Sequence, residues 1–111
     1  MVALAVLLGF VGGYANSAAE EPVVRITAQK FEYDRHEITL KKGVAVVIEL
    51  TSLDRVHGFN LPDFKTRADV IPGMATRVRF VPNKVGTFEF FCDVFCGDGH
   101  EEMTGKIVVK D

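Results

Sequence analysis

Four side chains that favour soft metals lie within twelve residues near the end of the chain. They are Cys92, Cys96, His100 and Met103, in the spacing C-x3-C-x3-H-x2-M, and a further imidazole, His57, lies well upstream. Thiolate, imidazole and thioether together favour copper, because soft sulfur stabilises Cu(I) while nitrogen suits both copper oxidation states. The sequence therefore predicts a copper site built from one short loop and one distant histidine.

The number of cysteines decides how many copper ions the site would hold. A mononuclear centre uses two His, one Cys and a weak axial Met. His57, Cys96, His100 and Met103 would supply these ligands, and Cys92 would then have no part in the site. Two thiolates four residues apart can instead bridge two copper ions across a tight turn. Each ion would then take one imidazole, while Met103 and the backbone carbonyl of Val94 cap them. Sharing a one-electron change between two ions reduces each bond-length adjustment and favours fast electron transfer.

Other interpretations of the same residues remain open. Cys92 and Cys96 are close enough in sequence to form a disulfide on a turn, as in many exported domains. Zinc would accept two Cys and two His but has no need of a thioether. His36 lies in a polar turn and is expected at the surface, and Met74 follows a Pro-Gly turn and is expected to pack at the rim of the site.

Size and charge exclude several classes of function. The chain has 111 residues, enough for one domain, and a net charge of −2 with no run of Lys or Arg. Nucleic-acid binding is therefore not expected. No acid–base pair or Ser-His-Asp pattern is visible. An electron-transfer module is favoured over an enzyme. A copper carrier or assembly factor using the same ligands, or a mononuclear redox protein, are the alternatives.

The first nineteen residues differ from the rest. They carry no charge, and an apolar run to Val11 is followed by Gly12-Gly13 and then small residues. This pattern is typical of a secretory signal, although no basic residue precedes the apolar run. Residues 1–19 are thus predicted to be a signal peptide or an N-terminal membrane anchor, with the domain at 20–111. Either leader places the domain in the periplasm or another extracytoplasmic space.

From residue 23 onward the chain has the pattern of short strands and turns. A Greek-key β-sandwich is predicted, because turn signals recur every ten or so residues. His57 is expected in the loop after the central strand, and the segment 92–103 in the loop between the last two strands. A short helix is weakly indicated at 63–69. The strands are expected at 23–27, 31–33, 37–40, 44–51, 75–80, 86–91 and 105–110.

Negative charge surrounds the predicted ligands. Asp93, Asp98, Glu101 and Glu102 lie in the loop, and no Lys or Arg occurs between Lys84 and Lys106. Such a loop is either simply solvated or an acidic rim that attracts a basic redox partner.

Residues 92–103, CDVFCGDGHEEM, resemble the dinuclear CuA loop of cytochrome c oxidase subunit II and of nitrous oxide reductase. The similarity extends to 54–59 (DRVHGF) and 71–73 (IPG), and covers most of 23–110, a cupredoxin domain. It implies two copper ions held by five side chains and one carbonyl, with both cysteines bridging. It also implies a redox partner such as a c-type cytochrome or a terminal oxidase or reductase. The ligands implied are His57, Cys92, Val94 (carbonyl), Cys96, His100 and Met103.

The sequence departs from the oxidase pattern in two ways. Val94 stands where oxidase subunits usually have a Glu that serves a neighbouring magnesium site, and the chain has no Trp for accepting electrons from a cytochrome. It therefore resembles a freestanding CuA-type cupredoxin more than an oxidase subunit. Nitrosocyanin, a mononuclear red-copper cupredoxin, is similar in outline but uses a single Cys and a Glu.

Overall fold

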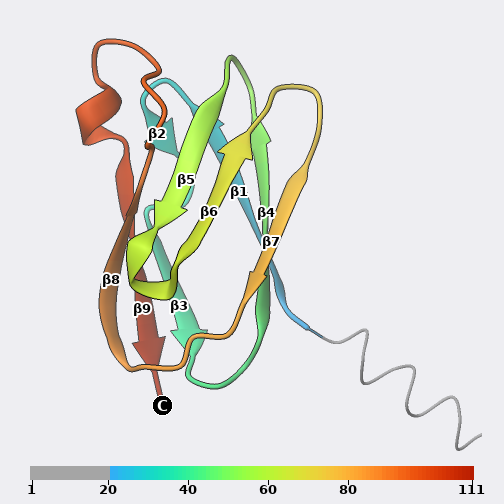
Figure 1. Cartoon of the computed structure of the whole chain (residues 1–111), viewed down its shortest axis with the longest axis vertical. Coiled ribbons are helices and arrows are strands. Elements are labelled where there is room, and N and C mark those ends of the chain that lie inside the picture. The colour runs from blue at the N-terminus through green and yellow to red at the C-terminus, as the bar shows by residue number, and fades with distance from the viewer. Residues whose placement is uncertain (1–20) are drawn as a thin grey trace, which may run out of the picture.

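The computed structural model describes residues 21–111, so the predicted leader at 1–19 lies outside the described residues. Residues 21–111 form nine strands and two short 3₁₀ helices (Figure 1). These elements are β1 (Val23–Gln29), β2 (Glu32–Tyr33), β3 (Glu37–Lys41), β4 (Val46–Ser52), β5 (His57–Leu61), η1 (Pro62–Phe64), β6 (Thr66–Val70), β7 (Thr76–Phe80), β8 (Gly86–Phe91), η2 (His100–Glu102) and β9 (Thr104–Lys110).

The strands are arranged in two sheets that pack face to face, which confirms the predicted all-β sandwich. One sheet has the order β2-β1-β4-β7 and the other β3-β9-β8-β5-β6. β1 runs parallel to β4 and β3 parallel to β9, and the remaining pairs are antiparallel. The loop 92–103 joins β8 to β9 at the upper end of the view in Figure 1, near the connections β4–β5 and β6–β7.

Alternating side chains build the core between the sheets. In β4, Val46, Ile48 and Leu50 are buried, as their period of two predicts. Three buried aromatic rings lie in the same core: Tyr33 and Phe59 each have a ring centroid 5.0 Å from that of Phe90. Aromatic pairs at such distances add to the stabilisation that burial alone gives. Together these three rings form a packed aromatic layer beneath the loops at one end of the sandwich.

The helix predicted at 63–69 is wrong. Only Pro62–Phe64 is helical, as the single 3₁₀ turn η1, and Lys65 ends it in the left-handed conformation at φ 49°. The chain then reverses into β6, which pairs antiparallel with β5. In β6, Ala68 and Val70 are buried while Arg67 and Asp69 are exposed, which is the alternation of a strand. Tertiary pairing outweighs the weak helical preference of this short polar segment.

The loop position predicted for His57 also needs correction. His57 is the first residue of β5, a strand that the sequence did not indicate, because Gly58 and Asn60 interrupt its apolar residues. β5 pairs with β6 along its whole length and with β8 through Asn60 and Phe91. The histidine is therefore held by the sheet and not by a loop.

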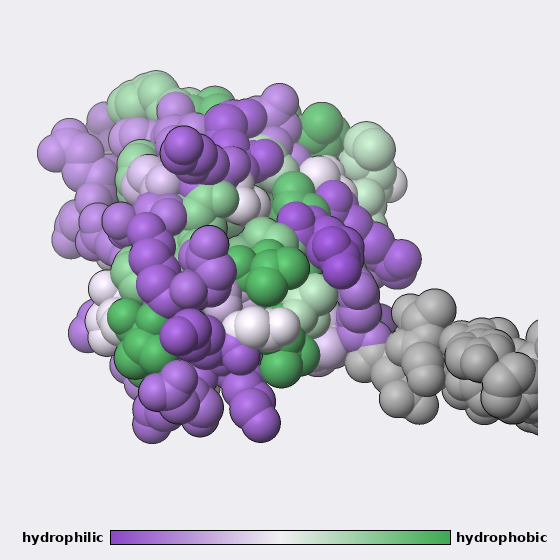
Figure 2. All heavy atoms as spheres, turned by 60° about the horizontal axis from the view of Figure 1, so that its bottom comes forward, coloured by the Kyte–Doolittle hydropathy of each residue, from purple (hydrophilic) through white to green (hydrophobic). Residues whose placement is uncertain are grey.

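Five of the nine large apolar residues that are exposed among residues 21–111 lie in loops at the end of the sandwich that carries the loop 92–103, called the metal loop after its predicted ligands. Figure 2 brings forward the opposite end of the sandwich, where hydrophilic residues dominate and apolar ones form small patches. In the loops at the metal end, five large apolar residues are exposed: Leu53, Val56, Ile71, Met74 and Phe95. Among residues 21–111 the structure contains no helix with the length and apolar character needed to cross a membrane.

Candidate metal centre

The two cysteines lie at the start and the middle of the loop that follows β8. The backbone amide of Cys92 donates to the carbonyl of Met103 at 3.1 Å, which closes the loop at its base. Both thiols are free and buried, with their Sγ atoms 3.7 Å apart. The structure thus shows no disulfide between them, and the two sulfurs face each other as a bridging pair would require.

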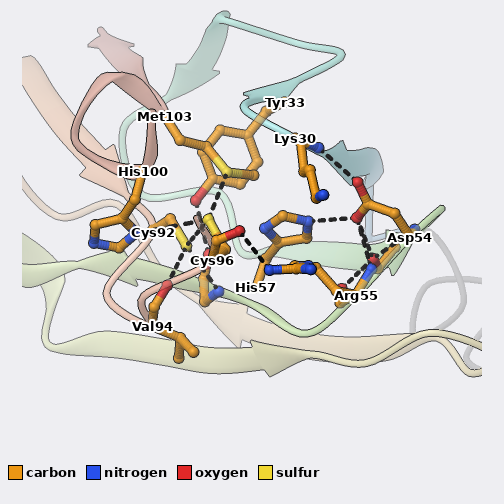
Figure 3. Close-up of polar contacts among 12 residues, drawn as sticks. Lys30, Tyr33, Asp54, Arg55, His57, Cys92, Val94, Cys96, His100 and Met103 are labelled. Carbon is orange, nitrogen blue, oxygen red and sulfur yellow. Dashed lines mark hydrogen bonds and ion pairs between the residues drawn. The ribbon is translucent and has the colours of Figure 1, made fainter. Parts of the chain in front are cut away.

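The remaining loop donors gather around these sulfurs (Figure 3). His100 Nδ1 lies 3.6 Å and Met103 Sδ 3.9 Å from Cys96 Sγ. The carbonyl oxygen of Val94 lies 3.1 Å from Cys92 Sγ. Each sulfur therefore has a different weak donor beside it, one thioether and one carbonyl.

His57 reaches the same sulfurs from the neighbouring strand. It is completely buried, and its donor atom and the two cysteine sulfurs all lie within 4.8 Å of one another. Its Nε2 is 2.7 Å from Asp54 Oδ1, whereas its buried Nδ1 has no hydrogen-bond partner among residues 21–111. A buried polar atom without a partner is costly. A metal ion bound at Nδ1 would satisfy it, so the residues fit a copper site.

Gly58 allows the loop to approach β5 closely. Its amide donates to Cys92 Sγ at 3.3 Å. A Cβ atom at this position would collide with the carboxylate of Asp93 and lie 3.0 Å from that residue's backbone nitrogen. The Gly58 carbonyl accepts a 2.7 Å hydrogen bond from the buried Tyr33 hydroxyl. Only glycine can therefore fill this position without moving the metal loop.

Two more glycines fit the loop against an aromatic ring. Gly97 and Gly99 have φ angles of 131° and 137°, a region that favours glycine. A Cβ atom would come within 3.0 Å of the Phe31 ring at Gly97 and within 2.6 Å at Gly99. Arg55 also holds this part, because its Nη1 donates to the Cys96 carbonyl at 3.0 Å. Phe31 and Arg55 were not predicted from sequence as part of the site.

Burial and charge shape the ionisation of the site. Burial raises the pKa of the Cys96 thiol, and the neighbouring Cys92 sulfur adds to the effect. Copper requires thiolates, so its binding must release protons and weaken as the pH falls. Burial also raises the pKa of Asp54, but hydrogen bonds from His57 and from the amides of Lys30 and Arg55 outweigh it, and this pKa falls to about 2. Asp54 is therefore ionised beside His57 at neutral pH.

Asp54 orients the imidazole, so replacing it is expected to weaken the metal site. In Asp54→Asn the His57 ring loses a charged partner that fixes its tautomer. Changes of this kind typically lower metal affinity by roughly 10-fold or more. Competition with a Cu(I) chelator would measure the loss. Glu32→Gln is a matched control, because Glu32 and His36 form an exposed pair 3.5 Å apart. An unchanged affinity in Asp54→Asn would contradict the role given to Asp54.

Other predicted residues lie outside the cluster of donors. The His36 side chain is exposed, as expected, and Met74 is 55% exposed. Phe95 is 75% exposed, with its ring centroid 5.7 Å from that of His100. Asp98 and the two Glu residues of η2 are exposed, but Asp93 is paired with Arg67 and does not belong to a free acidic rim.

The comparisons with known proteins agree with this geometry. Residues 1–109 match the model of the family described as "Cupredoxin-like domain". This chain belongs to the cupredoxin-like domain family. The cupredoxin-like domain is 34% identical over 88 residues to cytochrome c oxidase subunit 2 of Thermus thermophilus, which covers 79% of this chain and 65% of that protein. It is 37% identical over 91 residues to nitrous-oxide reductase of Ralstonia nicotianae, covering 78% of this chain and 14% of the enzyme.

A solved structure gives the same fold. The periplasmic domain of subunit II of cytochrome oxidase from Bradyrhizobium japonicum superposes with a TM-score of 0.74 at 22% identity, covering 80% of this chain and 83% of that one. The chain spans less than two thirds of the length of either curated relative above. The predicted closeness to the CuA domains of the oxidase subunit and of nitrous-oxide reductase is confirmed. Together with the Cys/His cluster, this relationship indicates a copper-binding electron-transfer domain.

Proposed function

We propose that this cupredoxin-like domain binds two copper ions between Cys92 and Cys96 and transfers single electrons between redox partners outside the cytoplasm. The observation that carries the proposal is the pair of free sulfurs 3.7 Å apart, surrounded by two imidazoles, a thioether and a carbonyl. The two cysteines would bridge the ions, and His57, His100, Met103 and the Val94 carbonyl would complete the ligand set. The copper pair would supply the reversible one-electron change.

The protein's own part is to keep these donors in place while the charge changes. His57 is fixed by β5 and Asp54, and the loop is closed at its base by the bond between Cys92 and Met103. Cys96 and Met103 are fully buried, which limits the access of water. A rigid and dry site reduces the rearrangement that accompanies electron transfer. No acid–base chemistry is required of any residue, and the domain is proposed to be an electron-transfer module and not an enzyme.

The surface around the loop 92–103 has features that suit binding to another protein. Leu53, Val56, Ile71, Met74 and Phe95 expose apolar surface in three neighbouring loops, and exposed apolar patches commonly mark interaction sites. Asp98 and the Glu residues of η2 add negative charge at the same end. A c-type cytochrome, or a terminal oxidase or reductase, with an apolar and basic contact surface would fit. Both this type of partner and the periplasmic location are proposed from the similarity of this chain to oxidase subunits.

Copper titration tests the proposal. The reduced domain, starting after the predicted leader, is loaded with Cu(I) and Cu(II), desalted, and its metal counted per chain. The dinuclear site predicts two copper ions with an intense visible absorption. A single ion with strong colour would favour a mononuclear redox protein instead. A colourless and readily exchanged Cu(I) would favour a copper carrier or assembly factor. Either result would overturn the proposed centre.

A further inference from the structure

Asp93 is bound by side chains from two strands that do not belong to the metal loop. Its carboxylate accepts hydrogen bonds from Arg67 Nε at 2.6 Å and Arg67 Nη2 at 2.8 Å. Asn60 Nδ2 donates a third, at 3.2 Å. Arg67 comes from β6 and Asn60 from β5, and Arg67 also pairs with Asp69 at 2.8 Å. The bidentate geometry makes this the strongest kind of side-chain ion pair.

The position of Asp93 gives this anchor its importance. Asp93 stands between Cys92, a proposed bridging ligand, and Val94, whose carbonyl faces the Cys92 sulfur. The backbone that joins these two donors therefore cannot shift without moving the Asp93 side chain. That side chain is only 18% exposed, and it lies against Gly58, whose amide binds the Cys92 sulfur. Holding Asp93 thus holds the start of the metal loop against β5.

The contact between Arg67 and Asp93 also affects the net charge beside the proposed metal site. An ionised carboxylate one residue from the metal sulfur would stabilise the more positive, oxidised state of a bound metal if it were unpaired. Arg67 places a guanidinium directly on that carboxylate and so offsets its negative charge, although the same guanidinium also pairs with Asp69. Because the anchor is only partly exposed, solvent screens it less than a fully exposed pair.

We propose that Arg67 is a positioning residue of the metal centre: it fixes Asp93, and with it Cys92 and the Val94 carbonyl, and neutralises the carboxylate beside them. Arg67 does not touch the proposed copper site itself. The positioning part of this proposal concerns the protein alone, whereas the charge part rests on the proposed copper function. Two measurements therefore test them separately.

The first measurement uses the reduced, metal-free domain in a Cys96→Ser background, where Cys92 is the single thiol. Adding Arg67→Gln is expected to raise the rate of Cys92 alkylation by iodoacetamide roughly tenfold, since the loop loses a bidentate charged anchor. Arg79→Gln is the matched control, because Arg79, in β7 of the other sheet, forms a bidentate pair with Glu21. The control should react at the parent rate. An equal rate in Arg67→Gln and the parent would overturn the positioning role.

The second measurement is the midpoint potential of the copper-loaded domain. Arg67→Gln leaves the carboxylate unpaired and should lower the potential, whereas Asp93→Asn removes the negative charge and should raise it. The double variant should return close to the parent value. A loosened loop alone would shift both single variants in the same direction. If both single variants shift the potential in the same direction, or do not shift it, the charge role is overturned. A parent domain that binds fewer than two copper ions would contradict the proposed function. The alkylation result would still stand in that case.

Discussion

Replacing Cys92 with Ser is expected to reduce the copper content from two ions per chain to one. A serine hydroxyl is a hard donor with a high pKa and does not form a stable bridge between copper ions as a thiolate does. Cys96, His57, His100 and Met103 remain, and they are the donor set of a mononuclear centre. The colour of the dinuclear site should be lost and replaced by that of a single copper–thiolate bond. Metal analysis and visible absorption of the loaded variant measure both effects.

Met74→Leu is the control for this experiment. Met74 is also a sulfur residue at the metal end, but it is 55% exposed and lies outside the cluster of donors. Its replacement should leave two copper ions and the parent spectrum. If Cys92→Ser also kept two ions and the parent spectrum, Cys92 would not be a bridging ligand.

Replacing Phe90 with Ala is expected to cause the largest loss of stability. Phe90 is fully buried and packs against Tyr33 and Phe59, and it lies directly under Gly105 of β9. Truncating a buried Phe costs about 3–5 kcal/mol, through lost burial and the cavity left behind. A domain of this size commonly has a free energy of unfolding of only about 5–15 kcal/mol. Urea denaturation of the reduced, metal-free domain would measure the change.

Phe95→Ala provides the comparison for Phe90. The Phe95 ring is 75% exposed at the tip of the metal loop, so its removal should change the free energy of unfolding by less than about 0.5 kcal/mol. Equal losses in the two variants would show that the aromatic core under the metal site does not carry the stability of the domain. A loss confined to Phe90→Ala would support a stabilising role for this buried aromatic core.

Much of the fold could be predicted from sequence because its strands carry a clear period of two. The central strand, with Val46, Ile48 and Leu50 inward, and the last strand, with Ile107 and Val109 inward, were placed correctly. The loop 92–103 stood out because it places two Cys, one His and one Met within twelve residues. These features are local, so short stretches of sequence are enough to reveal them.

The missed features depend on contacts between distant segments. β5 and β6 have weak strand character of their own and form because they pair with each other and with β8. Phe31 packs against Gly97 and Gly99, although they follow it by more than sixty positions in the sequence. Arg67 pairs with Asp93, which follows it by 26 positions. Only Asp54 left a local signal, as a carboxylate three residues before His57. The other supporting residues become visible only when the sheets are assembled.

The paramagnetic resonance spectrum of the oxidised, copper-loaded domain tests the central claim most directly. If one unpaired electron is shared between two copper ions held by Cys92 and Cys96, the spectrum will show more hyperfine lines than a single copper nucleus can produce. A spectrum with the splitting of one copper nucleus, from a sample that contains all the copper the domain can bind, would contradict the dinuclear centre.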